Sequence, residues 1–77
     1  MNVEDLNEYV NEESVRGELT REMLGILSDF ENKKIDKETK DMLIRSVEQG
    51  FHAEDAHSDE QTSKFLRKAV DALLTVV

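Results

Sequence analysis

The chain has 77 residues, a formal net charge of −8 and 38% hydrophobic residues, with no Cys, Trp or Pro and only three Gly. The absence of Cys excludes a disulfide framework and a thiolate metal site. The acidic charge opposes contact with nucleic acid or an anionic membrane and favours a basic protein partner. Length and composition predict a single small all-α domain, residues 1–77, because Pro is absent and Gly is scarce.

The beginning of the chain predicts one short helix and one long helix. Val3, Leu6 and Val10 recur at helical spacing, with Tyr9 beside them, and predict a helix over about residues 3–10. A break is expected near Asn11, which is a favourable N-cap residue. The second helix, over about 12–31, carries one clean apolar stripe: Val15, Leu19, Met23, Ile26, Leu27 and Phe30.

The rest of the chain predicts two further helices. Asp36 is a suitable N-cap for a helix over about 37–50, which ends at Gly50 with Phe51 packing just beyond, or continues toward Ala56. Ser58 begins a capping-box pattern for the last helix, over about 59–76. The apolar face of this last helix is roughly 200° wide and predicts either a docked end or an oligomer contact. The predicted fold is a compact bundle of three to four helices.

Sequence motifs for catalysis and cofactor binding are not found. His52 and His57 are five residues apart, so on a continuous helix they diverge by roughly 140° and do not chelate a metal together. If their segment is a loop, the acids Glu54, Asp55 and Asp59 offer an alternative weak metal site. Phosphate binding by a Gly-rich loop is excluded by the isolated glycines. We therefore expect no enzymatic activity, no cofactor and no bound metal.

One basic cluster interrupts the acidic chain. It consists of Lys33, Lys34, Lys37, Lys40 and Arg45. A nucleic-acid site requires more positive charge and stacking aromatic side chains, so direct nucleic-acid binding is not expected. We interpret these residues as a solvated face that balances neighbouring acids.

The first third of the chain concentrates the negative charge. Residues 1–31 hold nine acids against Arg16 and Arg21, a net charge of −7. Five of these acids fall at the very start: Glu4, Asp5, Glu8, Glu12 and Glu13. With Glu18 and Glu22 they form a strip that either keeps the protein soluble or imitates a phosphate backbone toward a basic, nucleic-acid-binding partner.

A second face of the 12–31 helix carries small residues around one leucine. It consists of Gly17, Arg21, Leu24 and Ser28, with Gly25 at its edge. Each Gly costs about 1 kcal/mol relative to Ala in a helix interior, so a close backbone approach is expected there. The approaching chain is either the first helix folding back or a partner; alternatively, Gly17 is a helix boundary.

These features predict a small acidic protein-binding module, a regulator or inhibitor of a basic partner. Its predicted partner-binding residues are Glu4, Asp5, Glu8, Glu12, Glu13, Gly17, Arg21, Leu24 and Ser28. The alternative is a homo-oligomeric structural or assembly subunit, for example of a phage particle. No signal peptide or membrane span is predicted, which favours a cytoplasmic location, and the composition is typical of a bacterial or phage product.

Overall fold

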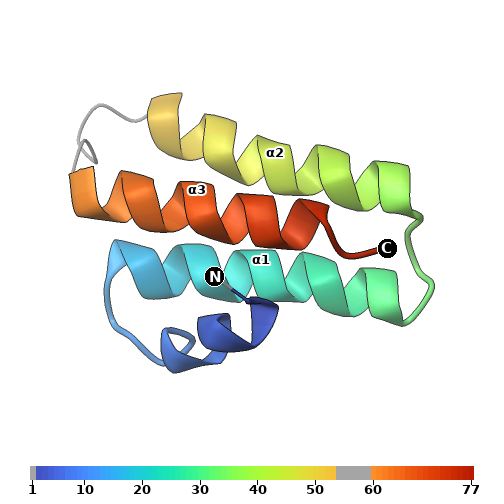
Figure 1. The fold of residues 1–77 in the computed structure, drawn as a ribbon, viewed down its shortest axis with the longest axis horizontal. Coiled ribbons are helices and arrows are strands. Elements are labelled where there is room, and N and C mark those ends of the chain that lie inside the picture. Colours follow the sequence, from blue (N-terminus) through green and yellow to red (C-terminus); the bar gives the residue numbers. More distant parts are fainter. Residues whose placement is uncertain (1, 54–59) are drawn as a thin grey trace.

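Four helical segments follow one another along the described residues, 2–53 and 60–77, of the computed structural model (Figure 1). The first, η1, is a 3-10 helix over Val3–Glu8. Three α-helices follow: α1 over Val15–Glu31, α2 over Lys37–Ala53 and α3 over Glu60–Leu74. The predicted all-α bundle is confirmed.

The first predicted helix is a 3-10 helix and not an α-helix. A 3-10 helix has three residues per turn, so Val3 and Leu6 share one face and Tyr9, just after the helix, continues it. Leu6 is fully buried, and Val3 and Tyr9 pack against the core. Val10, the third apolar residue of the predicted set, lies beyond the helix, which ends at Glu8.

The helix α1 begins three residues later than predicted. Its N-cap is Ser14, whose Oγ accepts the backbone N–H of Gly17 at 3.3 Å, and Asn11 does not serve as the cap. The end near Asn32 is as predicted. There the N–H of Lys34 donates to the carbonyl of Asp29 at 2.9 Å, and Lys33 has a left-handed φ of 61°. This six-to-one bond around a left-handed residue is a Schellman ending.

The helix α2 begins as predicted and ends later. Asp36 caps it, because its Oδ1 accepts the N–H of Thr39 at 2.8 Å. Gly50 does not end the helix, which continues to Ala53, and Phe51 lies buried within it. The further continuation toward Ala56 and the predicted cap at Ser58 lie outside the described residues.

The three α-helices pack against one another around a shared apolar core. Every pair of them is in contact, and η1 contacts α1 and α3 but not α2. The radius of gyration is 11.8 Å, close to the roughly 11.5 Å expected for a folded chain of this length. None of the helices in the described ranges is long and apolar enough to span a bilayer.

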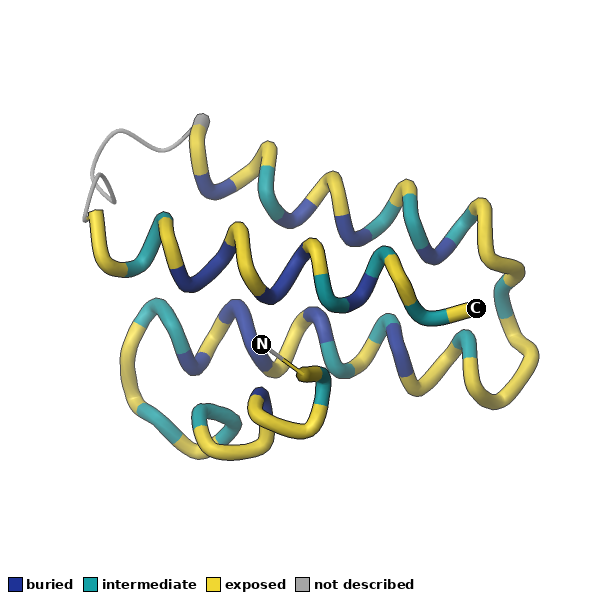
Figure 2. Tube along the Cα trace, viewed as in Figure 1, coloured by how far each residue is buried: buried dark blue, intermediate teal, exposed yellow. Residues whose placement is uncertain are grey.

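The wide apolar face of α3 is covered within one chain. Five of its residues are buried: Phe65, Leu66, Ala69, Val70 and Leu73 (Figure 2). They are enclosed from three sides because α1, α2 and η1 all contact α3. Val77, beyond the helix, is 89% exposed. Of the two predicted alternatives, a docked end or an oligomer contact, the structure agrees with docking, and η1 supplies part of the cover.

Candidate protein-binding surfaces

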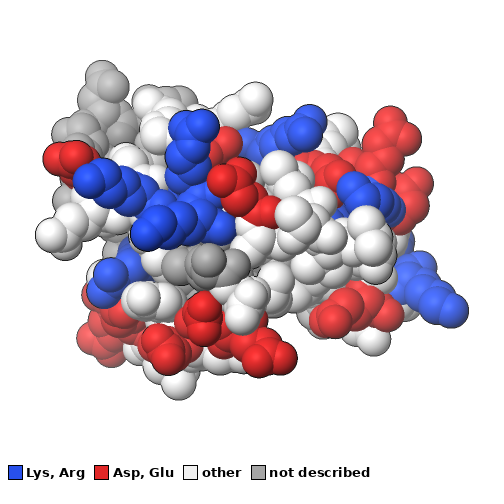
Figure 3. All heavy atoms as spheres, viewed as in Figure 1, with Lys and Arg blue, Asp and Glu red and all other residues white. Residues whose placement is uncertain are grey.

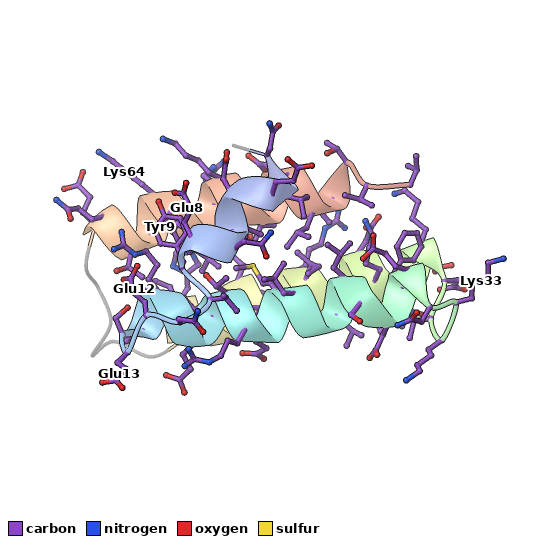
Figure 4. All side chains as sticks on the ribbon, turned by 90° about the horizontal axis from the view of Figure 1, so that it is seen from below. Glu8, Tyr9, Glu12, Glu13, Lys33 and Lys64 are labelled. Carbon is purple, nitrogen blue, oxygen red and sulfur yellow. The ribbon has the colours of Figure 1, made fainter. Side chains whose placement is uncertain are left out.

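The acidic start of the chain forms an exposed edge beside the bundle. Figure 3 shows acidic side chains along the edge where η1 lies and basic side chains over α3. Glu4, Asp5, Glu8 and Glu13 are exposed, and Glu13 points away from the body of the molecule (Figure 4). Asp5 also has a local role, because its Oδ2 accepts the backbone N–H of Asn2 at 3.0 Å.

Glu12 differs from the other predicted acidic residues because it fixes the segment that joins η1 to α1. Its Oε1 accepts hydrogen bonds from Arg16 Nε at 3.1 Å and Nη2 at 2.9 Å. The Arg16 hydrogen bond, with a second from Ser14, lowers the pKa of the Glu12 carboxyl. The Arg16 guanidinium also lies 4.7 Å from the ring centroid of Tyr9, which meets Phe65 edge-on at 4.7 Å. The carboxylate of Glu12 is therefore engaged by side chains of the same chain, unlike the exposed acids of the edge.

The predicted small-residue face is occupied at one end by the chain itself. A Cβ on Gly17 would lie only 2.0 Å from the carbonyl oxygen of Glu12, so only glycine fits there. Arg21 reinforces the contact, because its Nη1 donates to the carbonyls of Val10 at 2.9 Å and Glu12 at 3.2 Å. The approaching backbone is the segment after η1, not η1 itself. Gly17 and Arg21 thus hold the N-terminal segment in place.

The other end of this face is only partly exposed. Leu24 is half-buried and packs against the core. Ser28 is exposed and accepts a hydrogen bond from Asn32 Nδ2 at 3.4 Å. The nine predicted partner-binding residues therefore do not form one surface: the exposed acids lie outside, while Gly17, Arg21 and Leu24 serve the fold.

The three grooves between the α-helices differ in how they are filled. The α1–α3 groove is covered by η1, which contacts both helices. The α2–α3 groove is lined by charges of both signs, from Arg45, Glu48, Arg67 and Asp71. The α1–α2 groove contains a hollow of about 250 Å³, lined by Val15, Glu18, Leu19, Glu22, Ser46, Val47, Gly50 and Phe51. Its only charged lining residues are acidic.

A larger hollow of about 700 Å³ lies at the end of the bundle where α1 turns into α2. Phe30, Ile35, Val76 and Val77 supply its apolar lining. Glu31, Lys33, Lys34 and Asp36 surround them with charges of both signs. This mixed rim gives no net electrostatic preference for a partner.

Lys40 was predicted to lie on a solvated basic face, and this prediction is wrong. The side chain is fully buried, and its ammonium donates to the carbonyls of Leu73 at 2.5 Å and Val76 at 2.7 Å. Asp41 Oδ1 lies 3.0 Å from the same nitrogen. Two carbonyl acceptors and one carboxylate oxygen in ion-pair contact therefore surround the ammonium at the C-terminal end of α3, where the helix dipole favours a cation.

Carboxylates near the start of α2 are held in their charged form. Hydrogen bonds from Lys37 and then Lys40 lower the pKa of Asp41, and the backbone N–H of Thr39 lowers the pKa of Asp36. The Lys37–Asp41 bond measures 2.7 Å. These shifts arise from pairing that stabilises the helix start.

The predicted alternative metal site can be followed only in part. His52 is exposed and meets the ring of Phe51 edge-on at 5.4 Å. His57 and its acidic neighbours lie outside the described residues. Within the described ranges, no group of three or more His, Asp or Glu side chains is placed to hold a metal ion.

No family model, curated protein or solved structure matches the chain. The candidate surfaces therefore rest on the chain's own residues: the exposed acidic edge at η1 and the acid-rimmed hollow between α1 and α2.

Proposed function

We propose that the protein acts by binding another protein with a basic surface, as a small non-enzymatic regulator or inhibitor. The observation that supports this proposal is a set of exposed acids that form no salt bridge with any described residue. Within the described part of the chain, no salt bridge involves Glu4, Glu8, Glu13, Glu18 or Glu22, although ten Lys and Arg residues are present in the sequence.

Uncompensated surface acids favour association with a basic partner through long-range attraction. Such attraction raises the rate of encounter more than it lowers the rate of dissociation. Because these acids lie on η1, the following segment and α1, the attraction is strongest from the N-terminal third of the molecule. This distribution supports a directional approach by the partner.

The proposal is tested by affinity capture of partners at low and high salt. The full chain is tagged and compared with a variant in which Glu4, Glu8 and Glu13 are replaced by Gln. A matched control carries the same substitution at Glu31, Glu38 and Glu48, which lie elsewhere on the molecule. We expect one stoichiometric basic protein that is lost with the first variant and retained with the control.

The salt dependence decides whether the attraction is electrostatic. The Debye length falls from about 30 Å at 0.01 M salt to about 3 Å at 1 M, so capture should weaken steeply over this range. Capture that does not change with salt, or that survives the N-terminal substitutions, contradicts the proposal.

The alternative, a homo-oligomeric structural subunit, has less support. Its two motivating features, the face around Leu24 and the wide face of α3, are largely packed within one chain. The large apolar side chains exposed in the described ranges are Met42 and Val77, which contribute little area for a stable interface. Sedimentation at high protein concentration distinguishes the two: a monomer excludes the structural subunit.

A further inference from the structure

We propose that the α1–α2 groove receives a basic amphipathic helix of a partner protein, with one apolar side chain in the hollow and a Lys or Arg at its acidic rim. This inference rests on the proposed function, because it names the surface that contacts the basic partner. It places the bound helix on α1 and α2, while the exposed acids of η1 and the following segment act by long-range attraction.

The hollow is lined by residues of α1 and α2, two helices that run antiparallel (Figure 1). Val15 and Leu19 of α1 line it opposite Val47 and Phe51 of α2. Its volume of about 250 Å³ lies below the range of roughly 300–1,000 Å³ that is usual for small-molecule sites. A single apolar side chain presented by a partner helix fits this size better than a free ligand.

The charge at the rim identifies the chemistry of the partner. Glu18 and Glu22 are exposed, lie one helical turn apart and form no salt bridge within the described ranges. Two like charges at this spacing repel each other, and a cation between them would relieve the repulsion. The α2–α3 groove offers no such preference, because Arg45 and Arg67 line it together with its two acids. Between these two grooves, an apolar side chain flanked by Lys or Arg therefore complements the α1–α2 groove.

Gly50 keeps the groove open on the α2 side. It is exposed, and no atom lies within 4 Å of the place that a Cβ would take. Side chains on a helix lean toward the preceding turn, so a longer residue at this position would lie over Ser46 and Val47, which line the hollow. A bulky side chain at position 50 would thus block the groove without disturbing the core.

Gly25 provides a matched control for Gly50. It also lies exposed in a helix, with no atom within 4 Å of a built Cβ, and it does not line the hollow. Replacing either Gly by Gln, a better helix former, should raise the melting temperature. Loss of binding by Gly50→Gln therefore cannot come from unfolding.

The test uses a synthetic helical peptide of about 15 residues, long enough to form a helix on binding. One face carries Trp and Leu at helical spacing, and the opposite face carries Lys and Arg. Because the protein has no Trp, the peptide's emission alone reports burial. We expect a blue shift at low salt, an affinity about ten-fold weaker with Gly50→Gln, and no change with Gly25→Gln. Glu18→Gln with Glu22→Gln should also weaken binding.

A second peptide, with Ser in place of the apolar residues of that face and its Trp moved to one end as a reporter, separates this inference from the proposed function. If it binds as tightly as the first and is released by neutralising Glu4, Glu8 and Glu13, the groove inference fails and the proposed function stands. If neither peptide binds at about 0.01 M salt, where attraction reaches farthest, both fail. Equal binding by wild type and Gly50→Gln also overturns the groove inference.

Discussion

The two grooves that flank α1 differ: one is covered by the chain itself and the other is open. On the α3 side, η1 covers the groove and buries Leu6 completely. On the α2 side, no described segment covers the groove, and an acid-rimmed hollow remains. A six-residue 3-10 helix is not stable through helix propensity alone. The helix η1 therefore depends on its packing contacts with α1 and α3. Gly17 also lets the backbone of the segment after η1 approach α1, and no described segment approaches the open groove in this way.

The largest effect is expected from the lysine that joins α2 to α3. Lys40→Met removes a buried ammonium and leaves the carbonyls of Leu73 and Val76 without their donor. Leaving a buried acceptor without its donor costs about 1–3 kcal/mol per group, and two carbonyls lose the same donor here. Urea unfolding followed by circular dichroism measures the loss, and Lys68→Met, at an exposed lysine of α3, is the control. A Lys40 variant as stable as the control would contradict the burial.

The cover of the α1–α3 groove is tested by shortening its buried side chain. Leu6→Ala should lower the free energy of unfolding by about 2–5 kcal/mol, the usual cost of a large-to-small change in a core. The same denaturation experiment applies, with Val77→Ala as a control at an exposed position. Amide exchange should also show faster opening of residues 3–12 in the Leu6 variant. A loss no larger than that of the control would show that η1 does not contribute to the core.

The close approach at Gly17 gives an intermediate effect. Gly17→Ala places a Cβ 2.0 Å from the Glu12 carbonyl oxygen, so the segment must move. Overpacking of this kind costs about 1–3 kcal/mol, which outweighs the helix propensity that Ala gains. The expected signature is a lower melting temperature together with weaker protection of residues 9–12. An increase in stability would mean that the segment is not held against α1.

Substitution of the two glycines with open surroundings should raise the stability of the protein instead of lowering it. Gly25→Ala and Gly50→Ala add a Cβ where no atom lies within 4 Å. Each should raise stability by up to about 1 kcal/mol, because Ala is the better helix former. Thermal unfolding of the two variants beside Gly17→Ala gives a direct comparison of open and occupied helix faces. A loss of stability at either position would place an additional contact there.

The smallest single effects are expected from the paired carboxylates. The pKa of Glu12, Asp36 and Asp41 is lowered in the folded state by hydrogen bonds from Arg16, Thr39 and Lys37, respectively. Their stabilisation is therefore complete above the unfolded-state pKa of about 4 and is lost as the pH falls through the lower folded-state pKa.

Thermal unfolding in steps from neutral pH to about pH 2 measures this loss. Asp36→Asn keeps an acceptor for the Thr39 N–H but cannot titrate, so its curve should decline less steeply than that of the wild type. Parallel curves for the two proteins would exclude a contribution from Asp36.

Helix positions could be predicted well from the sequence because they depend on local patterns. The stripe from Val15 to Phe30 and the cap at Asp36 both follow from spacing and side-chain chemistry within a few residues. The start of α1 was misplaced because Asn11 and Ser14 are both good caps, and only the tertiary path of the chain selects one. At Gly50 the sequence allows either a helix end, a frequent role of isolated Gly, or continuation, and only packing selects continuation.

The contacts that define the candidate surfaces could not be predicted in the same way. Gly17 indicated a close approach, but the identity of the approaching backbone depends on the turn after η1. Lys40 shares a stripe with Ile44, Val47 and Phe51, and this spacing was a signal of burial that its charge obscured. The acids were found in the sequence, whereas the separation of Glu18 and Glu22 from the η1 edge requires the fold.

The burial of Lys40 has a consequence for chemical labelling. The sequence has six lysines, and the five others, Lys33, Lys34, Lys37, Lys64 and Lys68, are exposed. An amine-acylating reagent should therefore modify those five rapidly, while Lys40 reacts only after the end of α3 has separated from α2. The rate of acylation at this one amine, followed by mass spectrometry, therefore reports how often one end of the bundle opens.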